Sequence, residues 1–356
     1  MKKLFLALIL AMLTLSCGGS NGDADIPDNE QIPVETDTPT DMSVNTDGAD
    51  TISMYFPIWT NKNFRFESPT HPELTQDIYV TYTDGVRIQR RAASAGISAT
   101  EVLQLMDGEL RFIFGEPVFY FFEDLIAVEP TMDLLLLQEP LVVGNSWEMD
   151  NGAASEITAM DAEISVMGET MIAMEITTEF IDGRSQWEYY VRDLGLVKTV
   201  YTTFDGRTIE IILTDVAEQA TLIVPVDFFY PDPESELGYG IEEREIQIYT
   251  NKDLAAIFTE QLQIVGQSGF YWLPGGTVIN SIEVDRADDA LILDLSNSDI
   301  SSEDALQALA DTLGHFYGVS RVRPMANGQD YVADETTFGS NDFISVTVLP
   351  DQISHE

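Results

Sequence analysis

The sequence predicts an α+β protein, in which an antiparallel β-rich domain is followed by a two-layer α/β domain. Between residues 53 and 221, short apolar runs alternate with polar residues at period two and are separated by turn residues. After residue 222, two segments with helical spacing of apolar residues lie among strand-like runs. The length of 356 residues allows about two domains once a targeting segment is removed.

The N-terminus has the pattern of a secretion signal. Two lysines precede an apolar run from Leu4 to Leu15, which is too short to span a membrane as a mature helix. Ser16 then precedes Cys17, the single cysteine. A small residue before a cysteine in this context resembles the lipobox of bacterial lipoproteins, which implies cleavage after residue 16 and lipidation of the Cys17 thiol. We expect residues 1–16 to be a lipoprotein signal peptide; the alternative is an ordinary signal peptide with an incidental cysteine.

Residues 17–52 are expected to form an acidic, disordered tether. From residue 18 to 51 the sequence has nine acidic residues, no basic ones and almost no large apolar ones, so it cannot bury enough surface to fold. About 35 flexible residues span roughly 30 to 35 Å. Lipidated Cys17 would therefore hold the folded part outside the cell, a short distance from the outer face of the cell membrane.

The charge of the whole chain excludes one class of partner. Asp and Glu number 61 against 17 Lys and Arg, which gives a formal net charge of -44. Such a surface repels nucleic acid and anionic lipid, so contact with the membrane has to come from the anchor. A halophilic habitat would explain the same charge.

The β-rich domain is expected to span residues 53–221. Asp-Gly pairs at 84–85, 182–183 and 205–206 and Met-Gly-Glu at 167–169 predict antiparallel hairpins. One helix is predicted at 98–106, with Ser98 as its N-cap. The strands would form a twisted sheet that curls into an open barrel.

The C-terminal domain is expected to span residues 222–356. A helix at 254–265 with Asn251 as its cap and a second helix capped at Ser301 lie among strands in the order β, β, α, β, β, α, β. This order contains a β-α-β-β-α-β unit and predicts helices on one face of a mixed sheet. The inward side chains of the second helix are Leu306, Leu309, Leu313 and Phe316.

Three motifs of this C-terminal segment follow one another in a recognisable order. They are "LPGGT" at 273–277, "LDLS" at 293–296 and "TLGHFYGVSRVR" at 312–323. In these motifs the segment resembles the GerMN domain, the sporulation and spore germination domain of Gram-positive bacteria. The resemblance implies a non-enzymatic envelope domain, similar to ring-building motifs, that contacts copies of itself or partner proteins. It does not imply a role in sporulation, because the domain also occurs in lipoproteins with no assigned role.

The middle region carries a second resemblance. The motifs "EPLVVGNSWEMDNG" at 139–152 and "WEYYVRDLGLVKTVY" at 187–201 are similar to an uncharacterised β-rich domain that precedes GerMN in some lipoproteins.

Residues that could carry chemistry are sparse. The three histidines are His71, His315 and His355, so a histidine-based metal site or triad would need distant segments to converge. His315 is expected to point to solvent from the second helix. We therefore expect no catalytic site, no metal and no cofactor.

An acidic cluster and several aromatic residues have two interpretations each. The carboxylates could bind calcium, but they lack the EF-hand pattern and fit a charged hairpin tip better; they are Asp285, Asp288, Asp289 and Asp294. The aromatic run at 117–125 is either buried or lines a ligand cavity. Four further aromatic residues are expected in the core or at a sugar- or protein-binding surface; they are Trp147, Trp187, Tyr189 and Tyr190.

Three hypotheses about function follow. The first is a lipid-anchored, extracytoplasmic protein that recognises another envelope protein or itself, without catalysis, through the last domain's strands and the loop 273–277. The second is a carrier or sensor that binds a lipid or wall fragment inside the β-rich domain. The third is a wall-active hydrolase, which requires carboxylates or His315 to converge in a cleft.

Overall fold

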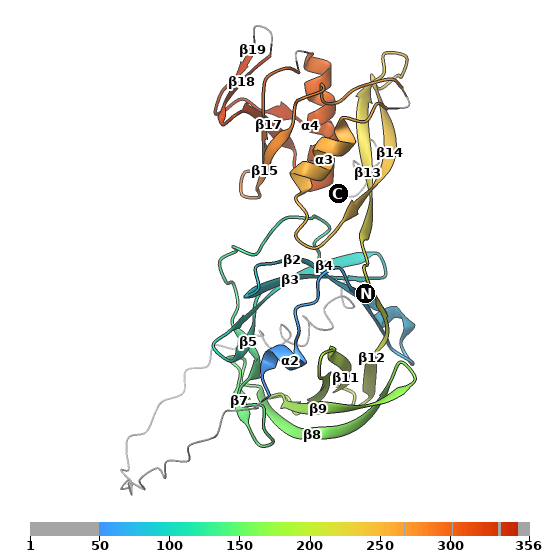
Figure 1. Ribbon diagram of the computed structural model, residues 1–356, viewed down its shortest axis with the longest axis vertical. Coiled ribbons are helices and arrows are strands. Elements are labelled where there is room, and N and C mark those ends of the chain that lie inside the picture. Colours follow the sequence, from blue (N-terminus) through green and yellow to red (C-terminus); the bar gives the residue numbers. More distant parts are fainter. Residues whose placement is uncertain (1–49, 267, 301, 334–335, 348–356) are drawn as a thin grey trace, which may run out of the picture.

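The protein consists mainly of β-structure. The computed structural model describes residues 50–266, 268–300, 302–333 and 336–347 (Figure 1). Of the described residues, 49% lie in strands and 11% in helices, and 12 strands form one nearly closed, barrel-like antiparallel sheet. The predicted α+β class is therefore wrong, because strand pairing dominates both parts of the chain. None of the helices in these ranges is long and apolar enough to cross a membrane.

The barrel-like sheet contains the first 12 strands. They are β1 (Asn63–Glu67), β2 (Gln76–Thr83), β3 (Arg87–Ser94), β4 (Ile97–Met106), β5 (Glu109–Glu116), β6 (Leu134–Gln138), β7 (Ser146–Glu148), β8 (Ala154–Val166), β9 (Glu169–Glu179), β10 (Ser185–Val191), β11 (Gly195–Thr202) and β12 (Thr208–Ala217). Two short helical segments accompany them, α2 (Ile52–Tyr55) and the 3-10 helix η1 (Pro72–Leu74).

The order of the strands brings the two ends of the sheet together. The order is β6-β5-β4-β3-β2-β1-β12-β11-β10-β9-β8-β7. Between the end strands β6 and β7, the indole Nε1 of Trp147 donates a hydrogen bond to the Leu135 carbonyl at 3.1 Å. Helix α2 lies inside the ring of strands, with Ile52 and Tyr55 buried in the core (Figure 1). The predicted antiparallel sheet that curls into an open barrel is confirmed.

Strand β4 replaces the helix predicted at 98–106. It pairs along its length with β3 and β5, and the side chains from Ser98 to Leu103 are buried on both faces. One face looks into the barrel, and the loop at 117–133 covers the other: the amide of Phe119 donates to the Ser98 carbonyl at 2.6 Å. The sequence was misleading because a strand buried on both faces lacks the alternation of a half-exposed strand, and the buried positions here include the polar Ser98, Thr100 and Glu101.

The C-terminal part contains the remaining elements. They are β13 (Leu222–Pro231), β14 (Tyr239–Ile248), α3 (Leu254–Leu262), β15 (Ile279–Asp285), β16 (Ala290–Leu295), α4 (Glu303–Tyr317), β17 (Arg321–Ala326), β18 (Gln329–Ala333), β19 (Thr336–Phe338) and β20 (Ile344–Ser345).

These strands do not form the single mixed sheet that the sequence predicted. Strands β13 and β14 pair only with each other, while a separate six-stranded sheet has the order β15-β16-β17-β18-β19 with β20 paired to β17. Strands β16 and β17 are parallel and the other pairs are antiparallel. The predicted two-layer β-α-β-β-α-β domain is thus wrong. The backbone hydrogen bonds of β13 and β14 are made within their own hairpin, and three short strands, β18, β19 and β20, extend the other sheet after β17.

The two helices begin at other caps than predicted. Asp253 caps α3 by accepting from the Ala255 amide at 2.9 Å, whereas the predicted cap Asn251 has a φ of 60° and bonds elsewhere. Ser302 caps α4, while the predicted cap Ser301 lies outside the described residues. Three of the predicted inward side chains of α4 are buried and the fourth is half-buried; they are Leu306, Leu309 and Leu313, and Phe316.

His315 does not point freely to solvent, contrary to the prediction. Its ring stacks on Phe229 with centroids 4.7 Å apart, and its Nε2 lies 2.7 Å from the Thr347 carbonyl. Gly314, one position before it, allows a close approach, because a Cβ would overlap the side chain of Val346. The histidine is therefore a packing residue between α4 and its neighbours.

Candidate functional site

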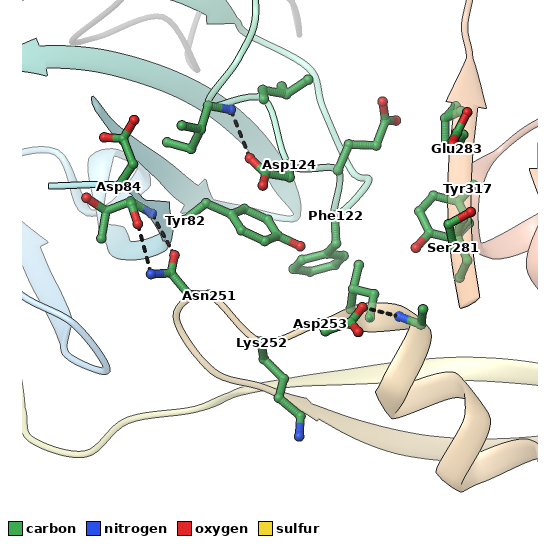
Figure 2. Close-up of a pocket in the computed structure, with 18 of the residues that line it drawn as sticks. Tyr82, Asp84, Phe122, Asp124, Asn251, Lys252, Asp253, Ser281, Glu283 and Tyr317 are labelled. Carbon is green, nitrogen blue, oxygen red and sulfur yellow. Dashed lines mark hydrogen bonds between the residues drawn. The ribbon is translucent and has the colours of Figure 1, made fainter. Parts of the chain in front are cut away.

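A cleft of about 770 Å³ lies between the barrel and the C-terminal part (Figure 2). The barrel contributes the end of β2, the turn after it and the loop at 122–126. The C-terminal part contributes residues 251–255, the strand β15 and the end of α4. The lining residues that carry polar or aromatic groups are Tyr82, Thr83, Asp84, Phe122, Glu123, Asp124, Asn251, Lys252, Asp253, Asn280, Ser281, Glu283 and Tyr317.

The barrel side of the cleft is held by one glutamine and one arginine of β3. The side-chain amide of Gln89 donates to the Glu123 carbonyl at 2.8 Å and accepts from the Leu125 amide at 2.7 Å. Arg87 donates to the carbonyls of Ile126 and Val128 at 2.8 and 3.0 Å. These bonds fix the loop against the outer face of the sheet, so the side chains of residues 122–124 have defined positions.

Asn251 joins the C-terminal part to the barrel. Its side chain accepts from the Thr83 amide at 2.7 Å and donates to the Thr83 carbonyl at 2.8 Å, as a strand partner would (Figure 2). Its own amide donates to the Thr81 carbonyl at 2.9 Å. The neighbouring Thr250 donates its hydroxyl to the Val80 carbonyl at 2.7 Å. The two walls of the cleft are therefore connected by a dense set of hydrogen bonds.

A second connection crosses from the turn after β15 to the loop of the barrel. Arg286 donates to the Tyr317 carbonyl at 2.7 Å and forms an ion pair with Glu123. Phe122 of the loop stacks on Phe316 of α4 with ring centroids 6.0 Å apart. The aromatic run at 117–125 is thus partly buried at the junction, and its residue 122 also lines the cleft.

The environment of the cleft raises the pKa of some of its ionisable groups and lowers the pKa of another. Burial raises the pKa of Tyr82 and Tyr317 well above the ordinary 10, with the carboxylate of Asp253 adding to the effect on both. The amides of Arg87 and Val86 lower the pKa of Asp84 by donating to its carboxylate. At neutral pH the cleft therefore presents neutral tyrosine hydroxyls beside a charged carboxylate.

The two histidines that the structure describes lie in different parts of the molecule. His71 lies before η1, next to Thr70 in a loop, and His315 packs on Phe229 in the C-terminal part. His355 and the lipidation candidate Cys17 lie outside the described residues, as do the signal peptide and nearly all of the predicted tether. Within the described ranges, no group of three or more His, Cys, Asp or Glu side chains is placed to hold a metal ion.

The other predicted residues have structural roles. Asp285 accepts from the amides of Ala287 and Asp288 at 3.1 Å, which fits the charged hairpin tip. Trp147 and Tyr190 are buried in the barrel, at 5% and 4% exposure, whereas Trp187 and Tyr189 are half-buried.

The loop at 273–277 is held by its ends. Leu273 and Thr277 are buried, and the Thr277 carbonyl accepts from Gln263 at 2.8 Å. Gly275 and Gly276 are exposed. The loop precedes the cleft residues of β15 in the chain, but none of its own residues lines the cleft.

The most important cleft residues were missed by sequence reasoning. Tyr82 and Tyr317 lie 235 positions apart in the chain, and each looked like one more apolar position of a strand or helix. Asn251 was interpreted as a helix cap. The available signal was that Asn251 and Asp253, two positions apart, are both residue types that cap helices. Only one of them can cap α3, so the other is free for another role.

Comparisons with known proteins give only weak likenesses. No protein-family model matches the chain, and no curated protein sequence matches it. Among solved structures, the tandem GerMN domains of the sporulation protein GerM from Bacillus subtilis align with 18% identity and a TM-score of 0.28, over 36% of this chain and 46% of that one. The chain thus spans about half the length of that structure.

Two other solved structures align at a similar level. A protein with a YmcC-like fold from Bacteroides fragilis, described as exported, aligns with 11% identity and a TM-score of 0.30, over 46% of this chain and 99% of that one. A protein from Clostridium perfringens described as a lipoprotein aligns with 19% identity and a TM-score of 0.21, over 35% of this chain and 93% of that one. TM-scores this low do not establish a shared fold.

Proposed function

We propose that this protein is a lipid-anchored, extracytoplasmic binding protein that recognises another protein of the cell envelope and does so without catalysis. The N-terminal pattern around Cys17 supports the location, and the motifs shared with GerMN domains support a role in protein contact. The observation that carries the proposal is the cleft of about 770 Å³ between the barrel and the C-terminal part. Clefts of roughly 300 to 1,000 Å³ at the junction of two parts are typical binding sites.

Recognition of a partner can be tested by crosslinking in intact cells. A photo-crosslinking residue at position 283 places the probe in the cleft, and one at position 275 places it on the exposed loop before β15. The control is position 181, whose isoleucine is 75% exposed in the turn between β9 and β10. We expect adducts of discrete mass from position 283 or 275 and none from position 181. A chain that gives no adduct from either of the first two positions, with a partner or with itself, contradicts the proposal.

A wall-active hydrolase is the second candidate, because carboxylates do converge in the cleft. Most of them already have structural bonds: Asp84, Asp124 and Asp253 accept from backbone amides, and Glu123 is paired with Arg286. Incubation with purified cell wall decides between the candidates. Release of soluble wall fragments that is lost in Asp124→Asn would favour the hydrolase.

The carrier hypothesis gains no support from the pocket in the barrel. This pocket has a volume of about 60 Å³ and is lined by residues such as Phe56, Trp59 and Arg90. Sites for ligands of drug size have volumes of roughly 300 Å³ or more, so the pocket is too small for a lipid or a wall fragment.

A further inference from the structure

We propose that the cleft binds a lysine or arginine side chain, presented by a basic segment of the partner protein. This inference rests on the proposed function, since it names the chemistry by which the partner is recognised. Four observations carry it: a hydroxyl without a hydrogen-bond partner on an otherwise buried tyrosine, a second hydroxyl facing it, an excess of carboxylates, and the size of the cleft.

The hydroxyl of Tyr317 is the first observation. The residue is 3% exposed and its ring packs against Phe258 and Phe316, yet the hydroxyl points into the cleft (Figure 2). Among the described residues, no side chain or backbone group forms a hydrogen bond with this hydroxyl. The hydroxyl opens onto the cleft, so its donor and acceptor positions are available to a ligand that enters there.

The hydroxyl of Tyr82 faces it from the barrel. In Figure 2 the Tyr82 ring extends toward Phe122 from one side of the cleft, while Tyr317 extends from the other. The carboxylate of Asp253 is close enough to act electrostatically on both tyrosines, and that of Asp124 acts on Tyr82. Two hydroxyls and two carboxylates, from four separate segments, therefore surround one space.

The charge of this space is negative. Five carboxylates line the cleft, and they are Asp84, Glu123, Asp124, Asp253 and Glu283. Arg286 neutralises Glu123, and Lys252, the cation of the lining, points away from the two tyrosines (Figure 2). Hydroxyl oxygens and carboxylates accept hydrogen bonds from ammonium and guanidinium groups, so the chemistry favours a cation with several N–H donors.

The size of the cleft favours a peptide over a small ion. A volume of about 770 Å³ exceeds what one ammonium group fills, and the lining mixes carboxylates with apolar side chains such as Leu254 and Ile282. Lysine and arginine match this mixture, because their apolar stems pack on such surfaces while the charged end meets the carboxylates. A bare metal ion does not, since the described carboxylates form no grouping of metal-ligand type.

Binding of defined peptides to the full chain in detergent tests the inference. The probes are a fluorescent nine-residue peptide of Gly and Ser with three lysines, the same peptide with glutamines in place of lysines, and spermidine as a competitor. We expect the lysine peptide to bind and the glutamine peptide not to bind. Asp253→Asn and Asp124→Asn should each weaken binding about tenfold, and Tyr317→Phe about two- to tenfold.

These substitutions leave the local bonds in place. An asparagine at 253 or 124 can still accept from the amide of Ala255 or Ile126, and asparagine is as good an N-cap as aspartate. Asp232→Asn is the matched control, because Asp232 accepts from the Glu234 amide at 3.0 Å in the turn between β13 and β14, outside the cleft. It removes the same charge, and we expect it to leave the affinity unchanged. Thermal unfolding of each variant confirms that the fold is retained.

Three outcomes would overturn the inference. The first is equal binding of the lysine and glutamine peptides, and the second is an equal loss of affinity in the control and the cleft variants. The third is tight binding of spermidine with no binding of the lysine peptide, which would assign the cleft to a small organic amine. If crosslinked adducts persist while the peptide fails to bind, only the ligand chemistry is wrong; if the adducts also fail, the proposed function is wrong.

Discussion

At the scale of single residues, the barrel interior contains charged groups that the spacing of apolar residues in the sequence does not predict. Arg90 and Glu101 form an ion pair at 2.5 Å, and the Glu101 side chain is 3% exposed. Glu188 faces the same interior, because it is the ladder partner of the fully buried Ile176. Burial raises the pKa of Glu188 to about 7, with Arg90 opposing this effect.

This raised pKa makes the stability depend on pH. In the unfolded chain Glu188 titrates near its ordinary pKa of 4.5, whereas in the folded protein it titrates at about 7. The folded state therefore holds the proton more tightly, and the stabilisation is fully present below pH 4.5 and is lost as the pH rises to about 7. We expect Glu188→Gln to be more stable than the native protein by about 1 to 3 kcal/mol at pH 8 and equally stable at pH 4. Urea unfolding at the two pH values measures the difference.

The control is Glu169→Gln, which removes an exposed carboxylate at the first residue of β9. It should change the stability equally little at both pH values. A Glu188→Gln variant whose stability follows the same pH curve as the native protein would show that this carboxyl does not titrate as inferred.

At the scale of elements, the end of α4 is where the helix, the sheet and the barrel loop meet. Gly318 ends the helix in the left-handed conformation, with a φ of 61°. A Cβ at this position would overlap the ring of Phe121, which belongs to the barrel loop. Glycine is therefore required twice, by its backbone conformation and by the close packing of the two parts.

Substitution at this corner should destabilise the protein by both effects. We expect Gly318→Ala to lower the free energy of unfolding by about 2 to 4 kcal/mol, because strain and overpacking add. Gly328→Ala separates the two: its φ of 71° is also positive, but a Cβ there meets nothing within 4 Å. We expect a loss of about 1 kcal/mol for that variant. Calorimetry on both variants checks the ratio, and similar losses would mean that Phe121 moves aside freely.

At the scale of the whole molecule, the anchor proposed at Cys17 can be tested together with the net charge. A net charge of -44 repels anionic surfaces, so the proposed attachment to a membrane would have to come from the N-terminus. Acyl chains contribute about 0.8 kcal/mol for each buried methylene, and two or more chains give stable attachment. We expect the native protein to enter the detergent phase and Cys17→Ala to remain in the aqueous phase, as measured by detergent phase separation.

A neighbouring substitution serves as the control for the anchor. Ser20→Ala lies just after the lipobox-like residues and should leave the partitioning unchanged. If Cys17→Ala enters the detergent phase as fully as the native protein, the N-terminus does not carry the anchor.

The sequence by itself determined the local features of this protein. Alternation at period two and the Asp-Gly and Met-Gly turns predicted the antiparallel hairpins, and these are local properties of a few neighbouring residues. The turn at Met167 and Gly168 shows why, since both residues take the positive φ that such a hairpin turn requires. The leucines of α4 were likewise readable from their spacing.

The tertiary structure alone decided the class of the fold and the site. Whether residues 97–106 form a helix or a strand depends on β3, β5 and the covering loop, and whether β13 and β14 join the larger sheet depends on which edges meet in space. Tyr82, Asp124, Asp253 and Tyr317 come from four segments that converge only because Asn251 bonds to Thr83 and Arg286 bonds to Glu123. Contacts between residues far apart in the chain leave no periodic signal in the sequence, so neither the cleft nor its charge could be predicted from it.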